Sequence, residues 1–195
     1  IKTFKWKGRV LNTEKKFKAT KIQPQLAIGH TRWATHGIPN DINAHPIKSF
    51  KKEFAIVHNG IIENYKELKK VLKKEGYKFF TETDTEVMVN FIELCVLNSD
   101  NIDKGISYAL SRIEGAFGIV LIKKSDPDIM YAARKGSPLA FGKKGNNFFI
   151  ASDATPIIEY TKKIIYLENG HLLKIDGNDF DCLLYTSDAA DEPMR

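Results

Sequence analysis

The chain has 195 residues, of which 43% are hydrophobic and 28% charged, and its formal net charge is +6. These values are typical of one globular domain with a buried core. The longest apolar run, residues 116–122, is too short to cross a membrane, and the two cysteines, Cys95 and Cys182, do not indicate a disulfide framework. No secretory signal opens the sequence, so we expect a cytoplasmic protein without a membrane partner.

The positive charge comes from 25 lysines and only five arginines, and many of the lysines fall in helical runs such as residues 66–74. Lysines in such runs are typical of the solvated face of a helix. We therefore expect no nucleic-acid partner. A basic nucleic-acid-binding module stays an alternative, and it would show strongly salt-dependent binding to DNA or RNA.

The chain begins at Ile1 in the middle of a pattern, without a methionine, a turn or a helix cap, so we expect it to be truncated there. Strand-like patterns and amphipathic helical stripes then follow in order. The strand patterns occupy residues 26–31, 54–58, 116–123, 129–133, 148–151, 164–167 and 171–175, and the helical stripes lie within residues 65–72, 87–95 and 102–113. Strands on both sides of a helical block, joined late in the chain by turn-forming residues, predict a layered α+β fold with antiparallel pairing.

The last residues of the chain have a different character. Residues 182–192 resemble the read-through translation of a sequencing adapter. We therefore expect residues 182–195 to be a non-native, disordered tail and residues 1–181 to form one natural domain. A short polar surface tail is the alternative.

The segment His30-Thr31-Arg32-Trp33-Ala34-Thr35-His36-Gly37 carries hydroxyls, imidazoles, a guanidinium and an indole within eight residues. Such a density of polar groups beside an aromatic wall suits one small polar ligand. Arg32, among apolar and hydroxyl residues, fits bidentate capture of a carboxylate, with a surface salt bridge as the alternative.

Histidines near this segment raise a second possibility. His30, His36, His45 and His58 could in principle hold zinc. No cysteine lies near them, however, and their spacing matches no zinc signature. We therefore expect no metal, and we expect the histidines to have structural or ligand-contacting roles.

Asn59-Gly60 ends a strand pattern and is the dipeptide typical of a tight hairpin turn. A helix follows instead of a return strand, so the Asn59 amide and the Gly60 N–H are expected to be available at a strand end. Two donors directed at one point form an oxyanion hole, which stabilises the charge that develops in acyl transfer.

Residues 83–86, Thr-Asp-Thr-Glu, form a capping-box pattern for the second helix. Asp84 in this pattern could also pair with a ligand ammonium group. A credible nucleophile is missing: Cys95 lies on the apolar stripe of a helix, and Ser137 lacks a Gly-x-Ser-x-Gly elbow and a paired base.

Several motifs occur together in one order. They are residues 30–37, 43–46 (Asn-Ala-His-Pro), 57–64 (Val-His-Asn-Gly-Ile-Ile-Glu-Asn), 81–86, 136–139 (Gly-Ser-Pro-Leu) and 151–153 (Ala-Ser-Asp). In these motifs the chain resembles the glutaminase domain of the glutamine–fructose-6-phosphate aminotransferase (isomerizing) family, also called glucosamine-6-phosphate synthase, a class II glutamine amidotransferase. The resemblance covers nearly all of residues 1–181. It implies a four-layer αββα sandwich of the N-terminal-nucleophile hydrolase type.

The resemblance also implies a reaction and roles for particular residues. An N-terminal cysteine attacks the side-chain amide of L-glutamine, releases ammonia and leaves a thioester that water hydrolyses. Carried over to this sequence, Arg32 would hold the glutamine α-carboxylate and Asp84 its α-ammonium group, and Asn59 with the Gly60 N–H would form the oxyanion hole. Trp33, Thr35 and His36 would belong to a loop that closes over the substrate.

The nucleophilic cysteine is absent from the sequence, so we expect this fragment to be inactive. The resemblance implies no cofactor, a C-terminal sugar isomerase domain in the same polypeptide, and a homo-oligomer for the full-length protein. Two alternatives stay open: another class II enzyme similar to amidophosphoribosyltransferase, and a non-catalytic ligand-binding domain that naturally lacks the cysteine.

Overall fold

The computed structural model describes residues 1–8, 10, 17–18, 20–32 and 37–185. Its strands are β1 (Ile47–Lys48), β2 (Phe54–Ile62), β3 (Gly115–Lys123), β4 (Ile129–Lys135), β5 (Ala140–Lys144), β6 (Asn147–Ala151), β7 (Ile164–Tyr166), β8 (His171–Asp176) and β9 (Asp179–Leu184). Its helices are α2 (Tyr65–Lys74), α3 (Asp84–Leu97), α4 (Ile102–Ser111) and α5 (Thr155–Ile158). The three long helices lie where the apolar stripes of the sequence predict them.

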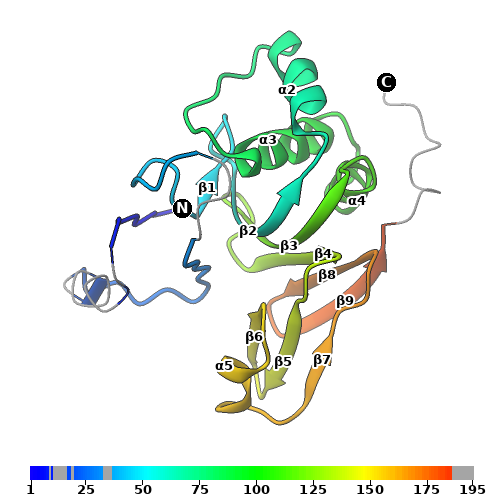
Figure 1. The fold of residues 1–195 in the computed structure, drawn as a ribbon. Helices are drawn as coiled ribbons and strands as arrows, with labels where there is room; N and C mark the ends of the chain where they lie inside the picture. Colours follow the sequence, from blue (N-terminus) through cyan, green and yellow to red (C-terminus); the bar gives the residue numbers. More distant parts are fainter. Residues whose placement is uncertain (9, 11–16, 19, 33–36, 186–195) are drawn as a thin grey trace.

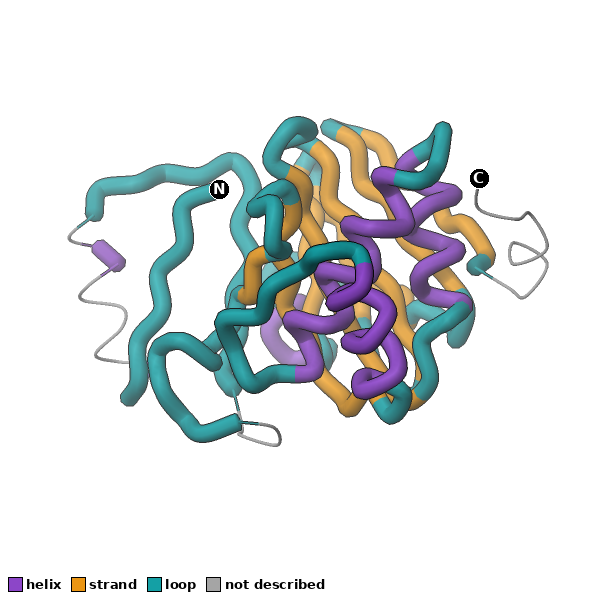
Figure 2. Tube along the Cα trace, turned by 90° about the horizontal axis from the view of Figure 1, so that it is seen from above, coloured by secondary structure: helices purple, strands orange, loops and turns teal. Residues whose placement is uncertain are grey.

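Six of the strands form one sheet in the order β1-β2-β3-β4-β8-β9, and every neighbouring pair is antiparallel. Helices α2, α3 and α4 cover one face of this sheet, as Figures 1 and 2 show from two directions. Successive residues of a strand point to opposite faces, so Ile56 of β2 and Leu121 of β3 pack under the helices. Their neighbours Val57 and Val120 belong to a second core on the other face.

The second core lies between this sheet and a smaller one with the order β6-β5-β7. Leu139 and Phe141 supply it from the side of the small sheet, and Leu173 and Ile175 supply it from β8. The short helix α5 packs on the outer face, so closely that a Cβ on Gly142 would lie 2.6 Å from a methyl group of Ile157. The layers are therefore helices, sheet, sheet and helix, which confirms the expected αββα sandwich (Figure 1).

Capping interactions fix where two of the long helices begin. The Thr83 hydroxyl accepts a hydrogen bond from the Glu86 N–H at the start of α3, and the Asn101 side chain accepts one from the Lys104 N–H at the start of α4. These are the side-chain types that satisfy the first backbone donors of a helix. Helix α3 is buried from Asp84 to Cys95, so it forms the centre of the helical layer.

The structure differs from the sequence prediction at several strands. Residues 26–31, which alternate like a strand, contain no strand in the structure, and β5 and β9 are strands that periodicity missed. Alternation predicts only that a segment can lie on a sheet. Membership of a sheet also requires a paired neighbour, and the described residues place none beside residues 26–31.

The predicted disorder of the tail is wrong for its first residues. Cys182, Leu183 and Leu184 pair with β8, and Tyr185 is 5% exposed and donates a hydrogen bond to the Arg134 carbonyl oxygen at 2.6 Å. A hairpin with β8 supplies backbone partners that a short sequence window does not reveal. Residues 186–195 lie outside the described residues, and the non-native origin of the tail stays a prediction.

Within the described ranges, none of the helices combines the length and the apolar character that a membrane crossing requires.

Candidate functional site

A small cavity of about 260 Å³ brings together residues from three parts of the chain. Arg32 enters it from the loop before β1, Asn59 and Gly60 from β2, and Asp84 from the first turn of α3. A concave site with a few convergent polar groups is the usual form of a small-molecule site. The structure thus places the four described residues that the sequence selected around one space. Trp33, Thr35 and His36 lie outside the described residues.

Asp84 is held rigidly on the α3 side of the cavity. Its carboxylate accepts hydrogen bonds from the Ile62 N–H at 2.9 Å and from the Thr85 N–H at 3.0 Å, and the residue is 4% exposed. The bond from Ile62 joins the start of α3 to the end of β2. A carboxylate has more acceptor sites than two bonds occupy, so Asp84 retains capacity for a cationic ligand group.

The capping-box pattern at residues 83–86 is confirmed in part. Thr83 caps α3 through the Glu86 N–H at 3.2 Å, as a capping box requires. The Glu86 carboxylate, however, accepts from the N–H groups of Phe80 and Thr81 instead of returning to Thr83. The carboxylate therefore fixes the segment that leads into α3 and does not point into the cavity.

Asn59 and Gly60 are not at a strand end, so that part of the sequence expectation is wrong. Both residues lie within β2, paired with Gly118 and Phe117 of β3, and both are exposed. Gly60 has φ +132°, and a Cβ there would lie 2.0 Å from the Ala116 carbonyl oxygen. Only glycine fits this close approach with this backbone conformation. The strand therefore presents Asn59 and Gly60 at the cavity without ending there.

Three histidines, His30, His45 and His58, line the cavity. His30 Nε2 lies 2.7 Å from Asn59 Oδ1, and the rings of His30 and His45 are 4.3 Å apart. His45 Nε2 and His58 Nδ1 are both hydrogen-bonded to the Thr85 hydroxyl, at 3.1 and 2.9 Å. Burial, together with the neighbouring His30, His58, Arg32 and Lys5, lowers the pKa of His45 to about 2, so this imidazole is neutral.

This arrangement bears on the zinc alternative. The Thr85 hydroxyl occupies one nitrogen of His45 and one of His58, and His30 is directed at an amide. Among the described residues, no group of three or more His, Cys, Asp or Glu side chains is placed to hold a metal ion.

The Arg32 side of the cavity is built from a loop. Arg32 is half-buried, and its Nη2 lies 3.5 Å from the Gly37 carbonyl oxygen. Beyond Gly37, the Glu82 carboxylate accepts from the Ile38 N–H at 3.1 Å and from Asn43 Nδ2 at 3.0 Å, and Asn43 Oδ1 accepts from the Glu82 N–H. We call these contacts of Asn43 and Glu82 the latch. The latch attaches the loop to the segment that precedes α3.

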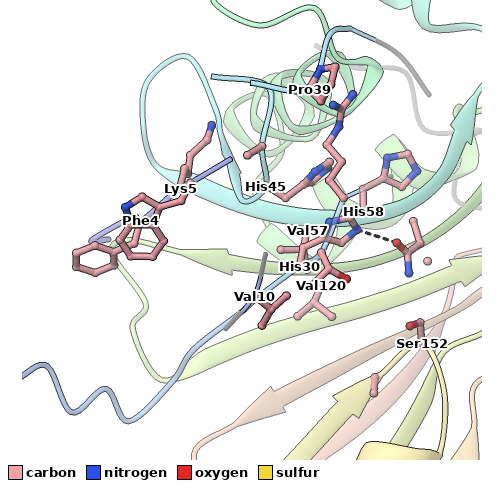
Figure 3. A pocket seen from close by; sticks show the side chains of 18 of the residues that line it. Phe4, Lys5, Val10, His30, Pro39, His45, Val57, His58, Val120 and Ser152 are labelled. Atoms are coloured by element: carbon pink, nitrogen blue, oxygen red, sulfur yellow. Dashed lines mark hydrogen bonds between the residues drawn. The ribbon is translucent and has the colours of Figure 1, made fainter. Parts of the chain in front are cut away.

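A larger cavity of about 650 Å³ adjoins the small one and shares His30, Arg32 and Asn59 with it. Its apolar wall includes Val57 and Val120 from the core between the sheets, and Figure 3 shows these beside the histidines. Phe4 and Lys5 of the N-terminal segment lie on the other side. Ser152 also lines this cavity. In the sequence, only the family-like motif at residues 151–153 indicated Ser152.

The two cysteines do not line either cavity. Burial raises the pKa of Cys95, which is 1% exposed, to about 12. An apolar environment of this kind makes a thiol inert. Cys182 is an exposed residue of β9. Partial burial of its thiol and the nearby Glu168 charge raise its pKa as well. The expectation that neither cysteine is the nucleophile of this site agrees with their positions.

Comparison with known proteins points to one family. Residues 30–159 match the family model described as a glutamine amidotransferase domain. Two proteins named glutamine–fructose-6-phosphate aminotransferase [isomerizing] are similar to the chain. The one from Bacteroides thetaiotaomicron is 45% identical over 177 residues, which are 90% of this chain and 29% of that protein. The one from Thermotoga maritima is 40% identical over 194 residues, 98% of this chain and 31% of that protein. The chain thus spans less than a third of the length of these curated relatives.

Solved structures agree about the fold. The glutamine phosphoribosylpyrophosphate amidotransferase of B. subtilis, complexed with ADP and GMP, has 25% sequence identity and a TM-score of 0.69, covering 80% of this chain and 34% of that chain. A structure described as the allosteric regulatory enzyme of purine biosynthesis has 24% identity and a TM-score of 0.70, with the same two coverages. The family match includes the loop with Arg32, strand β2 and the start of α3, and the chain belongs to the glutamine amidotransferase domain family.

Proposed function

We propose that this chain supplies the glutamine-binding part of a glutaminase whose ammonia converts fructose 6-phosphate to glucosamine 6-phosphate. The observation that carries the proposal is the convergence of Arg32, Asn59, Gly60 and Asp84 on one cavity of about 260 Å³. The names of the curated relatives, at 40–45% identity, support the sugar acceptor. The enzyme is thus proposed to be a glutamine-dependent aminotransferase.

Two of these residues are proposed to bind the two charged groups of the substrate amino acid. We propose that the Arg32 guanidinium binds the α-carboxylate of L-glutamine, for which its planar pair of donors is suited. The Asp84 carboxylate would accept from the α-ammonium group beside its two backbone bonds. Recognition of both charged ends would place the side-chain amide of the substrate toward β2.

Asn59 and the Gly60 N–H would then stabilise the reaction centre. The nucleophile is proposed to be the thiol of an N-terminal cysteine in the full-length gene product, whose own α-amino group accepts the proton. Sulfur bonds to the amide carbon, and the carbonyl oxygen becomes an oxyanion that Asn59 and Gly60 stabilise. The C–N bond then breaks, ammonia leaves with the proton, and water hydrolyses the thioester to glutamate. The 195-residue chain alone is expected to be inactive.

The remaining features of the enzyme are proposals from the same resemblance. A sugar isomerase domain in the same polypeptide would receive the ammonia. The curated relatives are long enough to contain such a domain, since this chain covers only 29% and 31% of two of them. The loop residues Trp33, Thr35 and His36 would close over bound glutamine and exclude water. A homo-oligomer, a cytoplasmic location and the absence of a cofactor are further expectations.

A second candidate is an amidophosphoribosyltransferase-like enzyme, which the two solved structures favour by their fold. Assays of the full-length gene product with glutamine and each acceptor separate the two. Formation of glucosamine 6-phosphate from fructose 6-phosphate supports the proposal. Activity only with phosphoribosylpyrophosphate would replace it with the second candidate, and glutamine binding without ammonia release would indicate a non-catalytic domain.

A further inference from the structure

The side chain of Asn59 has a defined partner in the structure. His30 Nε2 lies 2.7 Å from Asn59 Oδ1, the bond drawn as the dashed line from His30 in Figure 3. The carbonyl oxygen of an amide only accepts hydrogen bonds, so His30 must donate, and its Nε2 carries the proton. The other nitrogen of the ring, Nδ1, is buried without a hydrogen-bond partner among the described residues. This is the pattern of a neutral imidazole that uses its one proton on Asn59.

The ring of His30 is itself held in place. It packs against His45 with ring centroids 4.3 Å apart, and His45 is hydrogen-bonded to the Thr85 hydroxyl. Thr85 is 1% exposed and lies in the first turn of α3, next to Asp84. The contacts therefore run from the rigid start of α3 through two imidazoles to the amide of Asn59.

An amide can present either of its two ends to a ligand, and the two ends have opposite effects on an oxyanion. The NH₂ group stabilises negative charge, while the carbonyl oxygen repels it. The bond from His30 occupies Oδ1, which leaves Nδ2 as the end available to the cavity. We propose that His30 is a positioning residue that fixes the Asn59 amide with its NH₂ group toward the reacting oxygen. This inference rests on the proposed function, in which Asn59 is an oxyanion donor.

Loss of the His30 donor should have a different effect from loss of a residue that only supports the fold. When the donor is lost, the amide can turn by half a rotation and present its oxygen to the developing charge. His30→Phe retains a ring against His45 but removes the donor. We expect kcat for glutamine hydrolysis to fall between about tenfold and a hundredfold, with KM nearly unchanged, because the oxyanion exists only in the transition state.

A double-mutant cycle on the full-length gene product provides the test. The cycle compares wild type, His30→Phe, Asn59→Ala and the double variant, and His171→Phe in β8 serves as the control. If His30 acts through Asn59, the double variant has the same kcat as Asn59→Ala. His30→Gln, which restores an N–H donor, should recover part of the lost activity.

Three results would overturn the inference. Additive losses in the double variant would show that His30 acts independently of Asn59, and equal losses of kcat in His30→Phe and His171→Phe would show a general effect. Nitrogen NMR that places the His30 proton on Nδ1 would contradict the bond itself. A wild-type protein without glutaminase activity would instead overturn the proposed function together with this inference.

Discussion

The two sides of the small cavity are held in different ways. On one side, Asp84 and Asn59 come from α3 and β2, elements that the helical core and a network of hydrogen bonds immobilise. On the other side, Arg32 comes from the loop before β1, where its Nη2 lies 3.5 Å from the Gly37 carbonyl oxygen and the latch holds the residues beyond Gly37. We propose different tasks for the two sides. Groups that stabilise a transition state must be preorganised, whereas a group that captures substrate can move.

The largest expected effect concerns the rigid side. Gly60→Ala would place a Cβ 2.0 Å from the Ala116 carbonyl oxygen, at φ +132°, so β2 and β3 would have to separate. We expect the free energy of unfolding to fall by about 3 kcal/mol or more, measured by urea denaturation. Gly76→Ala is the matched control, since its φ is +80° but no atom lies within 4 Å of the new Cβ. It should cost only about 1 kcal/mol. Equal losses in both variants would show that the β3 contact is unimportant.

The buried imidazole of His45 provides a second test of the rigid side. Its pKa is lowered to about 2 in the folded protein, against about 6.5 in the unfolded chain, so the unfolded state binds more protons between these values. The stabilisation is complete above pH 6.5 and is lost as the pH falls toward 2. One such group contributes a slope of up to about 1.4 kcal/mol per pH unit. His45→Gln should reduce the slope of the unfolding free energy below pH 6.5, measured by urea denaturation at a series of pH values, and an unchanged slope would show that His45 does not titrate in this way.

The smallest expected effect concerns the loop side. Glu82→Ala removes the acceptor for the Ile38 N–H and Asn43 Nδ2, so the latch keeps only the bond from the Glu82 N–H to Asn43 Oδ1 and the loop that carries Arg32 is attached more weakly. We expect KM for glutamine to rise a few-fold in the full-length gene product, with kcat close to wild type. This rise corresponds to a loss of about 1 kcal/mol of binding free energy. The exposed residue Glu159 provides the control Glu159→Ala. A fall in kcat without a change in KM would contradict the division between the two sides.

Much of the fold could be predicted from periodicity, because three helices with one apolar stripe each need a sheet to cover. The stripe at residues 65–72 corresponds to α2, for example, with Leu68 and Leu72 buried. Strand β5 was missed because Ala-Phe-Gly-Lys-Lys has no alternation. It is a strand because β6 and β7 pair with it on both sides, which is a tertiary fact.

The candidate site was predictable in its residue types but not in its geometry. The Asn-Gly dipeptide and the helix that follows it led to the expectation that a strand ends at Asn59 and Gly60, whereas β2 continues through both residues. The actual reason for the glycine is the approach of Ala116, which is 56 residues away in sequence. The bond between His30 and Asn59 was equally hidden, because no local pattern indicates which amide a histidine will contact.

In the proposed function, Arg32 captures glutamine while Asn59 acts on its transition state. Steady-state glutaminase kinetics of Arg32→Ala and Asn59→Ala in the full-length gene product test it most directly, with the exposed Arg112→Ala as the charge-matched control. We expect Arg32→Ala to raise KM at least about tenfold with a small change in kcat. We expect Asn59→Ala to lower kcat about a hundredfold with a small change in KM. An unchanged KM in Arg32→Ala, or an unchanged kcat in Asn59→Ala, would contradict it.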